Sequence, residues 1–396
     1  MARTMKLSTI KVALSFLSLL KIMSAFNLKT ALHVVGSTKD DYYSAVSTYY
    51  ARQMVESDWH QGKYKFQYAV VNPDYSWSFP KSLDRDDIKS AEKCEMSDAI
   101  DHIKSNLDPD FMIPHMFCPE GMTKYRALFE NFLNIPLVGC DPTHMDLSMD
   151  KDLTRSVVSA AGVTVPQGIV VTSSDDSRLD SLALPVIIKP ACEDNSIGLS
   201  LARNANEVFK GVDDALKVDK KVIIEQFIPP GSEVRVGLIE REDGTLQILP
   251  KFEYHVSKSD PIRTQSHKLT NLDENGEVEL ASGKRNCPAD LSVEVCEELD
   301  RQAKLAHEAL QCRDYSLFDF RIDPEGKPYF LEACSYCSFA PRSVLMTMTD
   351  NTELKCPVFF DEMVNKALSR KKPEKASSIS KRFDEALVNG ARLVSV

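Results

Sequence analysis

Hydrophobic and polar positions switch between two periods along the first part of the chain. "KTALHVVGS" predicts a strand that ends at a glycine turn, and "DYYSAVSTYYARQMVES" has the spacing of a helix. "DFMIPHMF" and "IPLVGC" are short apolar runs typical of strands, with the helical pattern "KYRALFENFLN" between them. Strands that alternate with helices predict an α/β fold with a parallel sheet covered on both faces. We assign this pattern to a first domain at residues 30–148.

Two further regions follow the same reasoning. Residues 149–235 begin with the helical pattern "KDLTRSVVSAAGV" and continue through strand-like "LPVIIKP", the polar loop "ACEDNSIG", strand-like "LSLAR", helical "ANEVFKGVDDALK" and strand-like "KKVIIEQFI". Residues 236–370 hold a hairpin around Asp243-Gly244, the helix "SVEVCEELDRQAKLAHEAL" and a second hairpin. Both regions are predicted as α+β subdomains. Residues 371–396 form a polar tail that we expect to be mobile.

The second hairpin, "SLFDFRIDPEGKPYFLEACSYC", places two acids close together. If Asp323 pairs with Pro328 across the turn, Asp319 lies opposite Glu332. Directly opposed like charges destabilise a strand pair. A protonated acid, a neighbouring base or a bound cation would relieve the repulsion, and a slip of one residue would remove the pairing. The hypothesis that we follow is a divalent metal ion.

Composition narrows the class of protein. The chain has 396 residues, 43% of them hydrophobic and 27% charged, which is typical of a globular protein of two or three domains. A net charge of −10 argues against a general nucleic-acid binder, although local lysines can still bind nucleotides. The ten cysteines show no regular spacing and are expected to be reduced thiols. The single CxxC, Cys334 to Cys337, is a weak signal for zinc or redox chemistry.

Residues 1–29 form a basic leader or N-terminal extension. This stretch holds Arg3 and four lysines, no acid appears before Asp40, and the apolar run from Val12 to Leu20 is too short to span a bilayer. The pattern fits an organellar transit peptide, a secretory signal or an amphipathic first helix. No other segment approaches transmembrane length. We therefore expect a cytoplasmic protein, or an organellar one if the leader is a transit peptide.

Three residues carry candidate nucleotide chemistry. Lys189 closes the β-branched run "PVIIK", Glu225 ends "VIIEQFI" where it could accept an exocyclic amine, and Glu233 follows within reach of a ribose hydroxyl. Taken singly, each is more often a solvated surface residue. The loop "CEDNSIGLS" has one glycine and is not a Walker loop, but its backbone amides could cover phosphates. The order of these features along the chain is the stronger signal.

That order resembles the ATP-grasp superfamily, and within it the D-alanine–D-alanine ligases, from about Val35 to Leu345. The resemblance implies an ATP-grasp architecture in which two subdomains clamp ATP. It also implies magnesium at Asp319 and Glu332. The implied nucleotide residues are Lys151 and Lys189 at the phosphates, Glu225, Gln226 and Ile228 at the adenine, Glu233 at the ribose, Ser196 in the loop over the transferred phosphate, and Lys258 as a further phosphate lysine.

Substrate residues are implied more weakly. "PHMFCPEG" is similar to the family's substrate loop and brings in His115 and Glu120, Asp40 stands where the family has an acid that holds an ammonium group, and Ser343 would contact a substrate carboxylate. The implied reaction activates a carboxylate as an acyl phosphate, which an amine then attacks. Its partners would be small molecules, such as amino acids, with no nucleic acid and no membrane, and a homodimer is left open.

Three departures lie on the substrate side. Leu317 replaces the family's arginine two residues before Asp319, Cys334 replaces an asparagine metal ligand, and "SYCSFAPRSV" lacks a Pro-Gly turn. We expect Arg321, on the same face as Asp319, to replace part of the lost charge and to contribute to catalysis. Water should fill the coordination position at Cys334, with magnesium as the ion. Manganese, or zinc bound by the two thiols, is the alternative.

Two other functions stay open beside a D-amino-acid dipeptide ligase. The chain could be an ATP-grasp ligase for another amino acid or a secondary metabolite. It could also be a catalytically lapsed nucleotide-binding protein, which the loss of the arginine and the asparagine would permit.

Overall fold

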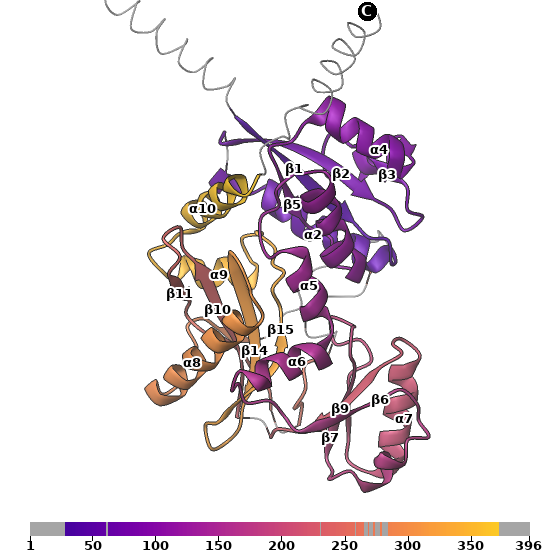
Figure 1. Cartoon of the computed structure of the whole chain (residues 1–396), viewed down its shortest axis with the longest axis vertical. Helices are drawn as coiled ribbons and strands as arrows, with labels where there is room; N and C mark the ends of the chain where they lie inside the picture. The colour runs from indigo at the N-terminus through magenta and orange to yellow at the C-terminus, as the bar shows by residue number, and fades with distance from the viewer. Residues whose placement is uncertain are drawn as a thin grey trace, which may run out of the picture.

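The computed structural model describes residues 28–371, except Gln61, Pro230, Lys258 and the short stretches 265–267, 269–271, 274–277 and 279–283. The predicted leader, apart from its last two residues, and the predicted tail, apart from its first, therefore lie outside the described residues. Three sheets follow one another from top to bottom of the molecule (Figure 1). Within the described ranges, no helix combines the length and the apolar content needed to cross a membrane.

The first sheet has the strand order β4-β3-β2-β1-β5. Its parallel strands are β1 (Lys29–Gly36), β2 (Tyr64–Val71) and β5 (Phe111–Pro114), and the short antiparallel strands β3 (Trp77–Ser78) and β4 (Lys93–Cys94) form one edge. The predicted strand "IPLVGC" is only an isolated bridge between Met112 and Leu137. The predicted parallel sheet is thus present, with an antiparallel edge.

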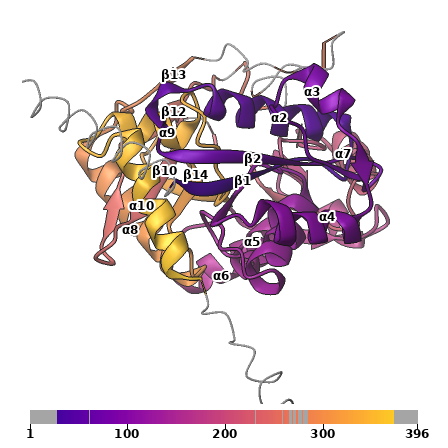
Figure 2. The same ribbon diagram turned by 90° about the horizontal axis from the view of Figure 1, so that it is seen from above.

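Helices cover both faces of this sheet, as predicted. Figure 2 shows α2 (Asp41–Val55) on one side of β1 and β2 and α4 (Met96–His102) on the other, whereas α5 (Pro142–Met149) lies below the sheet in Figure 1. The predicted helix "KYRALFENFLN" forms as two segments with π-type hydrogen bonding, η3 (Gly121–Tyr125) and η4 (Leu128–Phe132). Leu32 and Val34 pack with α4 and η4, whereas Ala31 packs in a separate core that α10 (Cys356–Ser369) completes.

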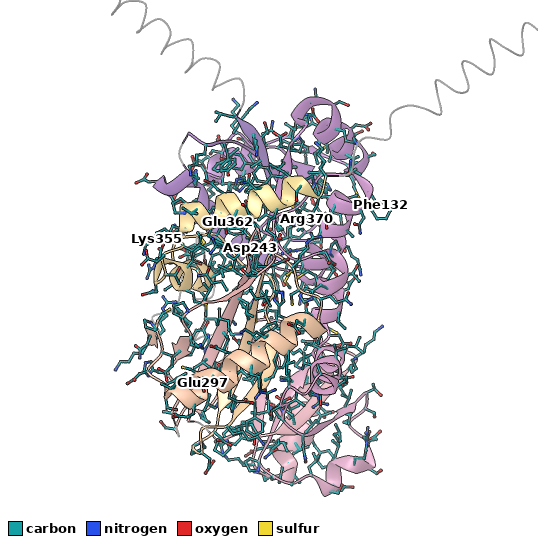
Figure 3. The ribbon with its side chains drawn as sticks, turned by 60° about the vertical axis from the view of Figure 1, so that its left-hand side comes forward. Phe132, Asp243, Glu297, Lys355, Glu362 and Arg370 are labelled. Carbon is teal, nitrogen blue, oxygen red and sulfur yellow. The ribbon has the colours of Figure 1, made fainter. Side chains whose placement is uncertain are left out.

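The helix α10 was not expected in this place. Tyr64 of β2 meets Phe360 edge-on at 5.6 Å between ring centroids and donates a hydrogen bond to Asp361 at 2.7 Å. At the same helix, Arg241 donates to Glu362 at 2.7 and 3.0 Å, and Figure 3 shows Glu362 on α10 near the turn that holds Asp243. The C-terminal helix therefore joins the first sheet to the third.

The other two sheets enclose the candidate site. The second has the order β6-β9-β7-β8 and the third β13-β12-β10-β14-β15, with β11 paired to β10. The second sheet consists of β6 (Gly168–Val171), β7 (Val186–Pro190), β8 (Ser200–Ala202) and β9 (Val222–Gln226), and α7 (Ala205–Leu216) packs on it. The helix α6 (Lys151–Ala160) packs against the third sheet. The third sheet consists of β10 (Ser232–Glu240), β11 (Leu246–Ile248), β12 (Phe252–Tyr254), β13 (Arg285–Asn286), β14 (Tyr315–Ile322) and β15 (Pro328–Ala333). The helix α8 (Val293–Ala309) precedes β14 in the chain, and α9 (Val344–Asp350) follows β15. A short helix of the first domain, α3 (Arg85–Ser90), lies between β3 and β4 in the chain.

The boundary placed between residues 235 and 236 needs correction. It would cut β10, whose residues from Ser232 to Ile239 pair continuously with β14. The second sheet ends with Gln226 of β9, so the two sheets divide between residues 226 and 232. The sequence "EQFIPPGSEVRV" contains this division at its proline-glycine stretch, which interrupts the strand pattern.

Candidate active site

The hairpin β14–β15 brings Asp319 directly opposite Glu332, as predicted. The register at the turn was predicted wrongly, because Pro328 pairs with Ile322 rather than with Asp323. Asp323 instead organises the turn, since its carboxylate accepts hydrogen bonds from the amides of Glu325 and Lys327 at 3.1 and 2.8 Å. A register shift between Asp319 and Phe320 then restores the expected pairing.

A positively charged side chain forms an ion pair with each of the two carboxylates. Arg235, opposite Asp319 on β10, donates from Nε and Nη2 to the two carboxylate oxygens at 2.5 and 2.6 Å. Lys151 Nζ lies 3.7 Å from Glu332 Oε2 and also donates to the carbonyl of Glu193. The repulsion between the acids is therefore relieved by two cations of the protein itself.

These acids fit a divalent ion, whereas the neighbouring thiol does not. Ligand atoms of Asp319, Glu332 and Cys334 all lie within 4.8 Å of one another. Burial disfavours ionisation of Glu332, but the surrounding cations together outweigh it and lower the pKa to about 2, so this carboxylate is charged; they are Lys151, Lys268, Lys189 and Arg235. Burial raises the pKa of the Cys334 thiol well above its ordinary value despite Arg235, so the thiol is neutral. Hard ions such as magnesium bind carboxylates and avoid neutral sulfur.

A cavity of about 110 Å³ lies beside the acid pair, between the second and third sheets. It brings together every predicted nucleotide residue that the structure describes, and both predicted metal ligands. These lining residues are Lys151, Lys189, Ser196, Glu225, Gln226, Ile228, Glu233, Asp319 and Glu332. Residues that lie up to 181 positions apart in the sequence, from Lys151 to Glu332, thus share one cavity.

An ion pair lies at the end of this cavity that β7 and β9 form. Lys189 Nζ lies 2.7 Å from Glu225 Oε1, and only 13% of the Lys189 side chain and 4% of the Glu225 side chain are exposed. Lys189 is therefore a paired residue of the cavity wall and not a free surface lysine. Past Glu225 the strand β9 ends, and the main chain of Gln226 to Ile228 continues along the cavity.

Glu233 and Arg321 pair with each other. Arg321 Nη2 lies 2.7 Å from Glu233 Oε2, and Arg263 Nη1 lies 3.2 Å from Glu233 Oε1. Arg321 also donates to the carbonyl of Pro261 at 2.9 Å. The expectation that Arg321 compensates for Leu317 at the acid pair is corrected, because the guanidinium on Asp319 belongs to Arg235.

The loop that holds Ser196 closes over this cavity. Asn195 and Ser196 adopt left-handed backbone conformations, with φ of 54° and 62°. Ser196 Oγ donates to the carbonyl of Arg263 at 2.8 Å, which ties the loop to the chain segment on the opposite side. Lys258, predicted as a phosphate lysine, lies outside the described residues.

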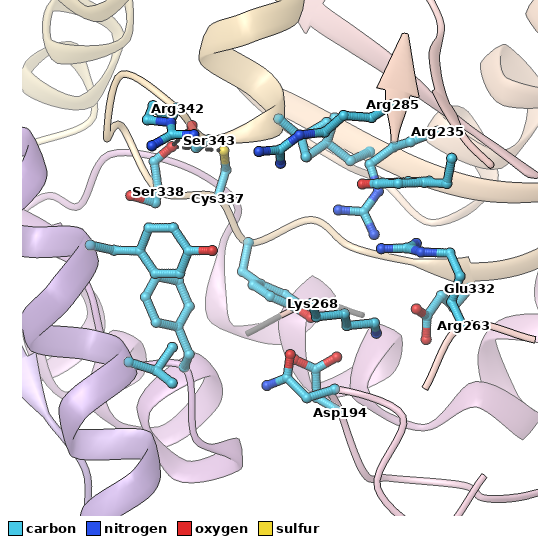
Figure 4. A pocket seen from close by; sticks show the side chains of 18 of the residues that line it. Asp194, Arg235, Arg263, Lys268, Arg285, Glu332, Cys337, Ser338, Arg342 and Ser343 are labelled. Carbon is cyan, nitrogen blue, oxygen red and sulfur yellow. Dashed lines mark hydrogen bonds between the residues drawn. The ribbon is translucent and has the colours of Figure 1, made fainter. Parts of the chain in front are cut away.

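A second cavity, of about 210 Å³, adjoins the first. Both are lined by Ile262, Arg263, Lys268 and Glu332, which form the wall between them. Ser343 lines the second cavity, as expected of a substrate residue, and its hydroxyl donates to the carbonyl of Ser338 at 2.6 Å. Figure 4 shows Arg235, Arg263 and Lys268 beside Glu332, with Ser338 and Ser343 across the cavity.

The weaker substrate predictions do not reach either cavity. His115 is fully buried, and its Nε2 lies 3.0 Å from Nδ1 of His33. Asp40 caps α2, where it accepts a hydrogen bond from the amide of Tyr43 at 2.8 Å. Glu120 is exposed at the start of η3. None of the three predicted residues lines the two cavities, so their substrate role stays a prediction.

Two features of the site were not found from the sequence. Arg235 and Lys268 were overlooked because each lies far from the hairpin in sequence. The signal for Arg235 was its alternation with Glu233 in "EVRVG", which places both on one face of a strand. The cysteines behave as expected, since all ten are free thiols, Cys334 and Cys337 among them.

Known proteins resemble this chain in sequence. A family model described as the C-terminus of D-ala D-ala ligase matches residues 157–365. A D-alanine–D-alanine ligase of Desulfotalea psychrophila is 28% identical over 62% of this chain and 74% of its own length. The vancomycin B-type resistance protein VanB of Enterococcus faecalis is 28% identical over 67% of this chain and 74% of its own length.

Solved structures agree with the fold. The VanG D-Ala:D-Ser ligase from Enterococcus faecalis superposes with a TM-score of 0.70 at 19% identity, covering 86% of this chain and 99% of that one. The D-alanine–D-alanine ligase from Coxiella burnetii gives a TM-score of 0.68 at 16% identity over 92% of this chain and 99% of its own. At these identities the superpositions establish the architecture alone.

Proposed function

The chain belongs to the D-alanine–D-alanine ligase family, and from this premise we propose that it is an ADP-forming ATP-grasp ligase that joins a carboxylate to an amine. The observation that carries the proposal is the wall between the two cavities. Glu332, Arg263 and Lys268 face both the nucleotide cavity and the cavity that holds Ser343. A phosphoryl group transferred from ATP to a carboxylate must cross such a boundary.

The proposed nucleotide pose follows the charges of the first cavity. The phosphates lie toward Lys151, beside the acid pair, and the adenine lies along Gln226 to Ile228, where the main chain leaves the sheet. Lys189 exchanges its ion pair with Glu225 for the phosphates when they enter, because they carry more negative charge than one carboxylate. Glu225 is then free to accept a hydrogen bond from the exocyclic amine of the base.

The reaction has two steps. A carboxylate oxygen attacks the γ-phosphorus, the bond to the β-phosphate oxygen breaks, and ADP leaves. The amine then attacks the carbonyl carbon of the acyl phosphate, phosphate leaves, and the amine releases a proton to solvent. Arg235, Arg263 and Lys268 lie where negative charge on the transferred group would be stabilised. The loop at Ser196 would exclude water from the acyl phosphate, which hydrolyses readily.

Magnesium is the ion that we propose for this site, with manganese as an alternative. Asp319 and Glu332 would hold it, and it would add positive charge to the phosphate oxygens. Because Arg235 occupies both oxygens of Asp319 in the protein alone, metal binding requires that this guanidinium shift. The neutral thiol of Cys334 would leave its coordination position to water.

The test measures products from ATP and magnesium with amino acids added singly and in pairs. We expect ADP and phosphate only when an acid and an amine are both present. Release of AMP and pyrophosphate would place the protein among adenylating enzymes and refute the proposal. ATP binding without turnover for any pair would favour a lapsed nucleotide-binding protein. Glu332→Gln, which removes one charge of the acid pair, is the inactive control.

A further inference from the structure

We propose that the second cavity accepts a substrate whose side chain carries an acid group in addition to the reacting groups. This inference rests on the proposed function, because it names the substrate class of the same ligase. Six cationic residues line the cavity, against the three acids Asp194, Asp260 and Glu332. The six are Arg235, Arg263, Lys268, Lys284, Arg285 and Arg342.

Two of these cations already have carboxylate partners. Arg235 is held by both oxygens of Asp319, and Arg263 by Glu233 at 3.2 Å. Arg263 also stacks on the ring of Tyr254, with 3.4 Å between the guanidinium carbon and the ring centroid. These two residues belong to the acid pair and the dividing wall. Lys268 also belongs to the wall and lies where the transferred phosphoryl group is proposed to be, so three cations remain to be explained.

The remaining three form a cationic set: Lys284, Arg285 and Arg342. Among the described residues, none of the three has a carboxylate within ion-pair distance. Two acids of the cavity have other partners, since Glu332 lies 3.7 Å from Lys151 and Asp194 interacts with the Tyr336 hydroxyl. Arg285 is partly buried, where an unpaired charge is costly. Among the described residues, the lining of this cavity thus has more cations than anions.

An ordinary amino acid does not supply enough anions. When two amino acids with neutral side chains are joined, one carboxylate becomes the acyl phosphate beside the dividing wall, and only the other remains to be bound. Leu317, which lines this cavity, adds no charge where the family pattern has arginine. Arg285 lies on β13, Lys284 directly before it and Arg342 on the loop before α9. Figure 4 shows the guanidinium groups of Arg285 and Arg342 away from Glu332.

Arg285 is the residue that we assign to the additional acid group. Figure 4 shows its guanidinium extending from β13 toward Cys337, into the space between Arg235 and Ser343. A guanidinium binds carboxylates and phosphates through two parallel hydrogen bonds, and it keeps its charge at every working pH. A side-chain carboxylate or a phosphate monoester would both satisfy this site, so the test separates them.

The experiment compares acids with neutral analogues of the same shape. The intact chain is assayed with ATP, magnesium and pairs of amino acids. Glutamate is compared with glutamine, aspartate with asparagine, and O-phosphoserine with serine, each in the D and the L form. Each of these amino acids is tested with every other one as the second substrate. We expect kcat/KM to be at least tenfold higher for one acid than for its neutral analogue. The pair that discriminates identifies carboxylate or phosphate as the group that is bound.

Variants locate the effect. Arg285→Gln should reduce the discrimination to near unity and leave the KM for ATP unchanged, and Arg285→Lys should keep part of it. Arg203→Gln, a change at an exposed arginine outside both cavities, should change neither quantity. Equal or better use of neutral analogues by the wild type, or full discrimination in Arg285→Gln, would overturn the inference and leave the ligase function standing.

A binding measurement covers the case without turnover. Calorimetric titration of the same amino acids into protein holding a non-hydrolysable ATP analogue should show preference for the acid, lost in Arg285→Gln. That result without turnover would support the anion site while refuting the ligase proposal. Equal affinities for acid and neutral analogues would refute the anion site.

Discussion

Replacing Arg235 with glutamine should weaken the third sheet because it leaves Asp319 without a partner. The Arg235 side chain is 15% exposed and that of Asp319 is 6%, so the charge would remain in a largely dry site. Removing one partner of a buried ion pair costs about 3–5 kcal/mol, and we expect the lower end of this range because part of Arg235 is exposed. At about 2–4 °C per kcal/mol, the midpoint of unfolding should fall by roughly 6–12 °C.

Calorimetry measures the midpoint, and hydrogen exchange of the β14 amides locates the transition in the third sheet. Arg241→Gln is the matched control, because Arg241 makes a two-bond pair with Glu362 just after the same strand, with 32% of its side chain exposed. Such a pair should contribute no more than about 1 kcal/mol. The double variant Arg235→Gln/Asp319→Asn should recover most of the lost stability. Equal midpoint shifts for Arg235→Gln and Arg241→Gln would refute the reasoning.

Three other predictions follow from paired or neutral groups. Lys189→Ala should weaken ATP binding, measured by calorimetry, and lower stability, measured by urea unfolding. The double variant Lys189→Ala/Glu225→Gln should recover the stability but not the ATP affinity. Unchanged ATP affinity in Lys189→Ala would contradict the nucleotide role. Cys334→Asn should keep turnover and lower the magnesium concentration for half-maximal rate, whereas loss of turnover in a folded variant, or a wild-type preference for zinc, would contradict the hard-ion site. Burial lowers the pKa of His115 to about 3, and burial with His115 lowers that of His33 well below its ordinary value. Below pH 6.5 the unfolded chain therefore binds more protons than the folded one. The contribution of these histidines to the free energy of unfolding should be complete above pH 6.5 and should fall between pH 6.5 and 3, by up to about 1.4 kcal/mol per pH unit for each histidine. His115→Gln should flatten this pH dependence in urea unfolding, and an unchanged slope would contradict the reasoning.

The parts of the site that local pattern could predict were predicted. Asp319 and Glu332 lie on two strands joined by a short turn, so the hairpin itself brings them close together. Their exact pairing depends on the bulge, which offsets the wrongly predicted register at the turn. The nucleotide residues were placed through the family's order of motifs, and the structure gathers them in one cavity. The first sheet followed from its alternating strands and helices.

The parts that depend on distant pairing were missed. Arg235 reaches Asp319 because β10 lies beside β14, although 84 residues separate them, and no local period reports such a neighbour. The same holds for α10, whose apolar face gave no indication that it would cover a sheet at the other end of the chain. The wrong register at the turn has a local cause, because a bulge changes the count by one residue without a signal in the alternation.

The most direct test of the central claim follows the oxygen atoms of the acid substrate. With a carboxylate labelled in both oxygens with ¹⁸O, the acyl-phosphate route transfers one labelled oxygen to phosphate, which mass spectrometry detects. We predict ADP as the nucleotide product and one ¹⁸O in each phosphate released by coupled turnover. Label found in AMP, or unlabelled phosphate at full coupling, would contradict the account.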